Sequence, residues 1–175
     1  TFTLRLLNQY FDLKLSDNQL ADYALKLGSD CPFFVYNKPQ LAYSRGEVLS
    51  DIAINIDWGA YKMLFIHPPL HISTQEAFSN LIPQKPNFDL AKINEIGIAE
   101  WKDHIKNDFE QLFLKHHPSM QLLKDELYSS GALYVSLTGT GSTFYAIFDQ
   151  TQQVALSENI VQYKHTWCEQ LNIKN

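Results

Sequence analysis

Residues 133–148 read LYVSLTGTGSTFYAIF, and this stretch decides the fold class. Its two ends, 133–137 and 143–148, are rich in β-branched and aromatic residues, which favour strands. The glycine-containing segment between them has the length of a hairpin connection, and such connections join antiparallel neighbours. The stretch therefore predicts two antiparallel strands side by side.

The rest of the chain adds strands and helices in a mixed order. Short apolar runs bounded by Gly, Pro or Asn predict further strands at 33–36, 41–44, 48–54, 62–67 and 164–168. Helical periodicity and two capping boxes, at 16–19 and 73–76, predict helices at 1–11, 16–27, 73–81, 89–96, 101–115, 119–129 and 152–159. The expected class is α+β, with a mostly antiparallel sheet covered by helices on one face.

Residues 1–11 form an unusually apolar predicted helix. At about 100° per residue, the apolar side chains cover an arc of about 200°, which is wider than a surface helix needs. We therefore expect this helix to pack against more than one neighbour. An exposed patch of this kind favours self-association, so an artificial dimer through residues 1–11 is one expectation for the isolated chain.

Composition places the chain among ordinary globular proteins. Of its 175 residues, 45% are hydrophobic and 19% are charged, which suits one good core. The net charge of −5 and the lack of a basic stripe argue against nucleic-acid binding, and the apolar runs are too short to cross a bilayer. Cys31 and Cys168 make no disulfide framework, so we expect a cytoplasmic protein.

A lone carboxylate lies in the turn KLGSDCPFF at residues 26–34. Gly28 is a usual helix stop and Pro32 pushes Cys31 toward extended backbone, which predicts Asp30 at a helix-to-strand corner. A corner of this kind can present a side chain to a ligand. An aspartate in a turn more often accepts a hydrogen bond from the nearby backbone, and the local pattern favours this second interpretation.

The glycine segment at 136–143 is the second candidate site. Gly139 and Gly141 flank Thr140, an arrangement that lets successive backbone amides point into one concavity and bind an anion. The alternative is a plain hairpin connection whose glycines supply positive φ. Because the glycine motif is incomplete, the local pattern favours this alternative.

The histidines and Cys31 give weaker signals. His67 and His71 have metal-like spacing, but the two prolines between them prevent the helix that would aim both rings one way. His116 and His117 are adjacent and diverge on a helix, so no metal site is expected. No sequence feature supplies a base for Cys31, and a small core residue is the simpler interpretation.

Five elements of the chain occur in a recognisable order. They are LGSDCPFF at 27–34, RGE at 45–47, the segment with His67-Pro68, Ser73-Thr74 and Phe78, NDFE at 107–110, and LTGTG at 137–141. In this order they resemble the 4-diphosphocytidyl-2-C-methyl-D-erythritol kinases, a family of the GHMP kinase superfamily, over nearly the whole chain. The resemblance implies a GHMP kinase C-terminal fold of the ferredoxin-like kind. It also implies transfer of the γ-phosphate of ATP, with Mg²⁺, to the 2-hydroxyl of 4-diphosphocytidyl-2-C-methyl-D-erythritol in non-mevalonate isoprenoid biosynthesis.

The resemblance also implies roles for individual residues. Asp30 matches the catalytic aspartate, which orients or accepts the proton of the attacking hydroxyl. Gly139, Thr140 and Gly141 match a loop beside the ATP phosphates. Thr74 and Phe78 match positions that line the substrate pocket, while a capping role for Thr74 and a core role for Phe78 are competing interpretations.

The family's ATP-phosphate loop and catalytic lysine precede the segment that resembles residues 1–11. The resemblance therefore implies that residues 1–31 are a helical remnant of the N-terminal kinase domain and that 32–175 are the C-terminal substrate-binding domain. It further implies that the chain by itself is inactive. Another GHMP kinase, of the homoserine or mevalonate type, and a non-catalytic α+β module that binds a ligand or partner protein are the alternatives.

Overall fold

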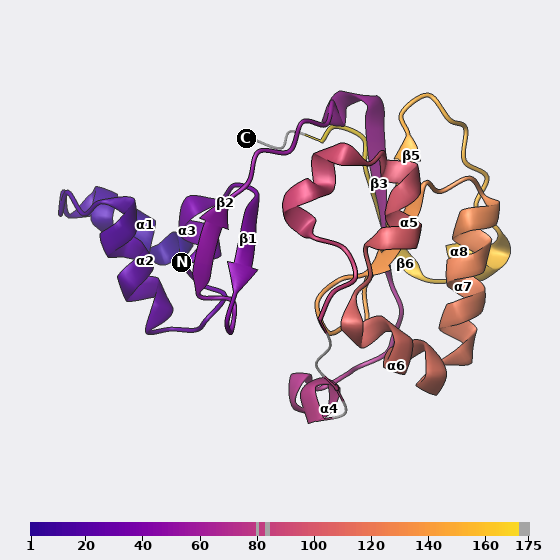
Figure 1. The fold of residues 1–175 in the computed structure, drawn as a ribbon, viewed down its shortest axis with the longest axis horizontal. Coiled ribbons are helices and arrows are strands. Elements are labelled where there is room, and N and C mark those ends of the chain that lie inside the picture. The colour runs from indigo at the N-terminus through magenta and orange to yellow at the C-terminus, as the bar shows by residue number, and fades with distance from the viewer. Residues whose placement is uncertain (80, 83–84, 172–175) are drawn as a thin grey trace. The chain divides into compact units, whose positions relative to one another are not determined.

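Two compact units make up the described chain, which the computed structural model gives as residues 1–79, 81–82 and 85–171 (Figure 1). Of the described residues, the first unit comprises Thr1–Asn55 and the second begins at Ile56 and continues to residue 171. The expected boundary between residues 31 and 32 concerns descent from a longer kinase. The two compact units are defined by contacts alone and do not test it, so this boundary stays a prediction. No helix in the described part of the chain is both long enough and apolar enough to cross a membrane.

The first unit combines helices with a β-hairpin. Its elements are α1 (Phe2–Tyr10), α2 (Asp17–Leu25), α3 (Phe33–Tyr36), β1 (Gln40–Tyr43) and β2 (Val48–Asp51). The expected capping box begins α2: Ser16 Oγ accepts from the Gln19 amide at 3.3 Å, and Gln19 Oε1 accepts from the Ser16 amide at 2.9 Å. The apolar face of α2 packs against α3, and the buried residues are Leu20, Ala21, Ala24 and Val35.

Residues 33–36 form the helix α3, so the predicted strand is wrong. Pro32 begins this helix with φ −57° and ψ −36°, because its ring already holds a helical φ. At the other end, the Asn37 amide donates to the Phe33 carbonyl at 2.8 Å. A short apolar run carries too little periodicity to separate strand from helix, and a single helical turn suffices to bury Val35 completely.

The apolar arc of α1 is mostly exposed within the described residues. Phe2 is 68% exposed and Tyr10 is 77% exposed, and no residue of α1 is fully buried. Leu4 is half-buried against the core of the first unit. Packing of α1 against further neighbours therefore stays a prediction.

The second unit is built on a four-stranded sheet. Its elements are η1 (Trp58–Ala60), β3 (Tyr61–His67), α4 (Thr74–Ser79), η2 (Leu90–Glu95), η3 (Ile98–Glu100), α5 (Trp101–His104), α6 (Asp108–His116), α7 (Pro118–Ser129), β4 (Tyr134–Leu137), β5 (Phe144–Asp149), α8 (Glu158–Val161) and β6 (Lys164–Cys168). The strand order is β4-β5-β3-β6, and each neighbouring pair is antiparallel. The predicted α+β class with an antiparallel sheet is confirmed.

One face of this sheet carries the main hydrophobic core. Strand alternation places Leu64, Phe144 and Val135 on that face, and α6, α7 and α8 pack against it (Figure 1). The buried residues of the core are Leu64, Ile66, Phe113, Met120, Leu123, Leu127, Ala132, Val135, Leu137, Phe144, Ala146, Phe148 and Ile160. On the opposite face, Trp101 of α5 meets the ring of Tyr134 edge-on, with 5.6 Å between the ring centroids.

Three predicted helices differ from the observed ones. The helix predicted at 101–115 is divided into α5 and α6, because Asn107 accepts the Phe109 amide at 2.9 Å and so caps a new helix. The segment 89–96 contains the 3₁₀ helix η2 instead of an α-helix. The segment 152–159 is mostly irregular, and α8 begins only at Glu158, after Ser157.

Candidate functional site

Asp30 lies in the turn between α2 and α3 of the first unit. It is therefore at a helix-to-helix turn, and the predicted helix-to-strand corner is wrong because α3 replaces the strand. The turn is closed by the Cys31 amide, which donates to the Gly28 carbonyl at 3.1 Å. The Asp30 side chain is exposed, and no described residue forms a hydrogen bond or ion pair with its carboxylate.

Other aspartates in turns of this chain behave differently. Asp57, Asp89 and Asp149 each accept a hydrogen bond from the amide two residues further on, at 3.1, 3.0 and 2.9 Å respectively. This is the local role that the sequence pattern favoured for Asp30. The structure contradicts that interpretation, because the Asp30 carboxylate does not cap its own turn. It is available to a ligand.

The turn between β1 and β2 approaches Asp30 within the first unit. Gly46 has φ +101°, and a β-carbon placed on it would lie 3.0 Å from Asp30 Oδ1. The neighbouring Glu47 is held by local hydrogen bonds, including the Arg45 amide at 2.8 Å. Hydrogen bonds from the Glu47 and Arg45 backbone amides and from the Ser44 hydroxyl lower the pKa of Glu47, so this second carboxylate stays ionised. The predicted motifs at 27–34 and 45–47 therefore meet at Asp30.

The Gly139–Gly141 loop connects β4 and β5 in the second unit. Both glycines have positive φ, +53° and +102°, as the hairpin interpretation requires. Within the loop, the Gly141 amide donates to the Thr138 carbonyl at 3.0 Å, and the Thr138 amide donates to the Thr143 carbonyl at 2.8 Å. In the part of the chain that the structure describes, no acceptor takes the amides of Gly139 and Thr140. The loop is therefore a hairpin connection with two free backbone donors, and anion binding by them stays a prediction.

Side chains outside the loop hold it, and no local sequence pattern predicts this role for them. Asn107 Nδ2 donates to the carbonyls of Leu137 and Gly139, each at 2.8 Å. Glu110 Oε2 accepts from the Leu137 amide at 2.8 Å. Both residues belong to the NDFE motif at 107–110. The family resemblance includes this motif but implies no role for its residues.

The far end of the loop is held from the end of β3. Ser142 Oγ donates to the Leu70 carbonyl at 2.6 Å. His67 Nδ1 and Thr143 Oγ1 are 3.1 Å apart and form a hydrogen bond. The His67-Pro68 element of the sequence pattern therefore supports the loop.

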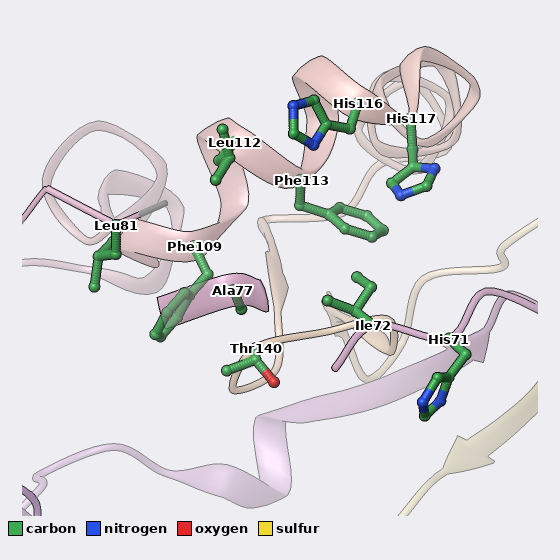
Figure 2. A pocket seen from close by; sticks show the side chains of 10 residues that line it. All are labelled: His71, Ile72, Ala77, Leu81, Phe109, Leu112, Phe113, His116, His117 and Thr140. Atoms are coloured by element: carbon green, nitrogen blue, oxygen red, sulfur yellow. The ribbon is translucent and has the colours of Figure 1, made fainter. Parts of the chain in front are cut away.

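A pocket of about 150 Å³ lies beside the loop, between α4, α6 and Thr140 (Figure 2). Its lining is mainly apolar, and comprises His71, Ile72, Ala77, Leu81, Phe109, Leu112, Phe113, His116, His117 and Thr140. A space of this size resembles cavities that hold a single benzene ring, so it accommodates one small apolar group. Figure 2 shows the ring of Phe113 between α6 and Ile72.

The two predicted substrate contacts lie on α4, next to this pocket. Thr74 is the first residue of α4 and is exposed. Phe78 is 58% exposed and meets the ring of Phe109 edge-on, with 4.9 Å between centroids. Phe78 is therefore not a core residue, which removes the competing interpretation. Contact of Thr74 and Phe78 with a substrate stays a prediction.

The remaining candidates have ordinary environments. The rings of His117 and Phe113 contact each other at 4.9 Å between centroids and are tilted by 44°, and Cys31 is half-buried against the core of the first unit. Among the described residues, no three His, Cys, Asp or Glu side chains group closely enough to hold a metal ion.

Comparison with known proteins shows which proteins the chain is similar to. Residues 90–164, which run from η2 to β6, match the family GHMP kinases C terminal. The chain is 40% identical over 148 residues to 4-diphosphocytidyl-2-C-methyl-D-erythritol kinase of Bacteroides thetaiotaomicron. It is 34% identical over 173 residues to the kinase of the same name from Bacteroides fragilis. The chain is a homologue of these kinases.

The alignments cover different shares of the two proteins. They include 85% and 99% of this chain, but 53% and 61% of the two Bacteroides kinases. The chain thus spans little more than half the length of the relatives it matches. The alignment with the Bacteroides fragilis kinase covers almost every residue, so both candidate regions belong to the homologous segment.

Two solved structures share the fold. A crystal structure of 4-(cytidine 5'-diphospho)-2C-methyl-D-erythritol kinase superposes with a TM-score of 0.67 at 21% identity, over 81% of this chain and 51% of that chain. Homoserine kinase from Cytophaga hutchinsonii superposes with a TM-score of 0.55 at 16% identity, over 93% of this chain and 60% of that chain. At these identities the likeness shows the fold alone.

Proposed function

We propose that the protein is a cytoplasmic 4-diphosphocytidyl-2-C-methyl-D-erythritol kinase, which transfers the γ-phosphate of ATP to the 2-hydroxyl of that alcohol. In this reaction the hydroxyl oxygen forms a bond to the γ-phosphorus, the bond to the bridging oxygen of ADP breaks, and the hydroxyl proton is released. The observation that carries the proposal is the 34% identity over 173 residues with a kinase of that name. The product enters non-mevalonate isoprenoid biosynthesis.

Asp30 is the residue we propose as the catalytic acceptor of the hydroxyl proton. Its support is the exposed carboxylate, which has no partner among the described residues while comparable aspartates cap their turns. Phosphoryl transfer passes through a loose transition state, so a carboxylate contributes chiefly by orienting the hydroxyl toward phosphorus. A free and exposed carboxylate fits that task.

The Gly139–Gly141 loop is the part of this chain that we propose to lie beside the ATP phosphates. The free amides of Gly139 and Thr140 are suitable donors for phosphate oxygens. A β-carbon placed on Gly139 would have no heavy atom within 4 Å, so the surface above this residue is open. Mg²⁺ enters the proposal with ATP, because this ion is commonly held by phosphates, waters and one or two carboxylates.

The direct test is Asp30→Asn in the product of the complete gene, with Asp22→Asn as the matched control. Asp22 is an exposed carboxylate on α2 in the same unit and has no partner among the described residues. Loss of a positioned proton acceptor lowers kcat by about 10² to 10⁴-fold. ADP release in a coupled assay measures both variants. Near-normal turnover of Asp30→Asn removes Asp30 from the mechanism.

A panel of acceptors separates this function from its alternatives. The complete protein is offered 4-diphosphocytidyl-2-C-methyl-D-erythritol, homoserine and mevalonate with ATP and Mg²⁺. Transfer to the first alcohol alone supports the proposal, and transfer to either of the others assigns a different GHMP kinase. No transfer to any of them favours a binding module. We expect residues 1–175 alone to show no transfer, and measurable turnover by this chain contradicts that expectation.

A further inference from the structure

The Gly139–Gly141 loop has little structure of its own. Two backbone hydrogen bonds, Gly141 to Thr138 and Thr138 to Thr143, close it at one end. Gly139 and Gly141 both have positive φ, and they make the backbone of the loop easy to deform because glycine adopts many conformations. The directions of the free Gly139 and Thr140 amides must therefore be set by groups outside the loop.

Asn107 holds the start of the loop, and both the nitrogen and the oxygen of its carboxamide form hydrogen bonds. Its nitrogen donates to the carbonyls of Leu137 and Gly139 at 2.8 Å each, and its oxygen accepts from the Phe109 amide at 2.9 Å. Carbonyls only accept, so this orientation of the carboxamide is required. The single side chain links the first turn of α6 to the first glycine of the loop.

Glu110 holds the same strand end from the first turn of α6. Leu137 is the last residue of the edge strand β4, and its amide donates to Glu110 Oε2 at 2.8 Å. Glu110 Oε1 forms an ion pair with Lys124 of α7, and the two side chains are only 12% and 18% exposed. Water competes weakly at this depth, so the pair fixes the carboxylate more firmly than a surface pair does.

We propose that Asn107 and Glu110 are positioning residues that aim the Gly139 and Thr140 amides at the phosphates of ATP. This inference rests on the proposed function, because it takes ATP as the ligand of the loop. Neither side chain needs to touch the nucleotide. Their contribution is a loop whose donors already point in the binding direction, which reduces the reorganisation on binding.

The test is Asn107→Asp in the complete protein. This change keeps the shape of the side chain but turns the two donated hydrogen bonds into oxygen–oxygen repulsions with the Leu137 and Gly139 carbonyls. We expect KM for ATP to rise about tenfold or more, with KM for the acceptor alcohol within about twofold of the wild type. The dissociation constant of adenosine 5'-(β,γ-imido)triphosphate rises in parallel.

Asp108→Asn is the matched control, because Asp108 is the exposed neighbour on α6 and has no partner among the described residues. It should retain both KM values. A folded Asn107→Asp variant with an unchanged KM for ATP overturns the inference. An equal rise of both KM values overturns it too, because a merely structural role affects both substrates.

Glu110→Gln keeps the inference testable if Asn107→Asp does not fold. Glutamine retains an oxygen acceptor for the Leu137 amide but loses the ion pair with Lys124. We expect a smaller rise in KM for ATP, about threefold, and no rise at all contradicts the inference. If the wild type transfers no phosphate, the proposed function fails while the analogue's dissociation constants still test the positioning role; a wild type that does not bind the analogue overturns both.

Discussion

Asp30 Oδ1 rests against the α-carbon side of Gly46, where an added β-carbon would lie 3.0 Å from that oxygen. Gly46 also has φ +101°, a backbone conformation that side chains with a β-carbon rarely adopt. Glycine thus serves two purposes here: it permits the turn between β1 and β2, and it leaves room for the carboxylate. The Arg45-Gly46-Glu47 element is thereby connected to the proposed catalytic residue.

Gly46→Ala should lower both stability and activity. The positive φ costs about 1 to 2 kcal/mol of unfolding free energy, measured by urea titration with circular dichroism. The displaced carboxylate should lower kcat about tenfold or more, because misplacement of a catalytic group by about 1 Å is costly. In an Asp30→Asn background the same change should lower kcat no further. If the two losses of kcat add in the double variant, Gly46 affects activity by a route other than Asp30.

Gly59→Ala is the control for crowding of a carboxylate. A β-carbon on Gly59 would lie 3.2 Å from Asp57 Oδ1, but this glycine has no positive φ and belongs to the second unit. We expect unchanged kcat. If Gly59→Ala lowers kcat as much as Gly46→Ala does, the contact between Gly46 and Asp30 is not the cause of the loss.

Leu127→Ala should destabilise the second unit far more than Leu122→Ala does. Both leucines lie on α7, but Leu127 is fully buried and Leu122 is 66% exposed. The buried change costs about 2 to 5 kcal/mol of unfolding free energy, and the exposed one stays within about 0.5 kcal/mol. Tryptophan fluorescence reports this unit, because Trp58, Trp101 and Trp167 all lie in it. Equal losses of unfolding free energy in the two variants contradict the assignment of Leu127 to the core on the sheet.

Elements with local signals are the ones that sequence predicts well. The capping box at Ser16 and Gln19 joins residues three positions apart, and α2 begins there as expected. β6 occupies the predicted residues 164–168. Where local signals compete, prediction fails. Pro32 favours extended backbone at Cys31 but begins α3, and Asn107 starts α6 inside a segment that the sequence predicts as one helix. Such choices depend on tertiary burial.

The candidate site shows the same division. The sequence located Asp30 and the glycines of the loop, because each belongs to a short motif. It did not show that Asp30 lacks a backbone partner, since that depends on the rotamer and on the packing of the turn. It could not show that Asn107 holds a carbonyl 30 residues away, because only the packing of α6 against β4 brings them together.

Tyr145→Phe should weaken the loss of stability at alkaline pH. Burial raises the pKa of Tyr145 above its ordinary value of 10.0, and hydrogen bonds with Tyr134 and Ser136 offset only part of that rise. The unfolded chain therefore releases this proton first as pH rises through about 10, so it binds fewer protons and gains stability relative to the folded state. The wild type should lose unfolding free energy between about pH 9 and pH 11, and Tyr145→Phe should lose less.

The measurement is urea unfolding at several pH values, followed by tryptophan fluorescence. Tyr10→Phe is the control, because Tyr10 is 77% exposed on α1 and lies in the first unit. Its pH profile should match the wild type. If the pH profiles of Tyr145→Phe and the wild type are parallel, the half-buried phenol of Tyr145 does not have a raised pKa.

Phe78→Ala should impair binding of the acceptor without impairing the fold. The ring is 58% exposed and contacts Phe109 at its edge, so its removal costs about 1.5 kcal/mol of unfolding free energy or less. If the exposed face packs against the acceptor, stacking of a base on such a ring contributes about 1 to 3 kcal/mol, and KM for the acceptor should rise about tenfold. KM for ATP should not change. The control is Leu122→Ala, which truncates an exposed apolar side chain on α7 and should leave both KM values unaltered. A folded Phe78→Ala enzyme with the wild-type KM for the acceptor excludes this ring from the substrate site.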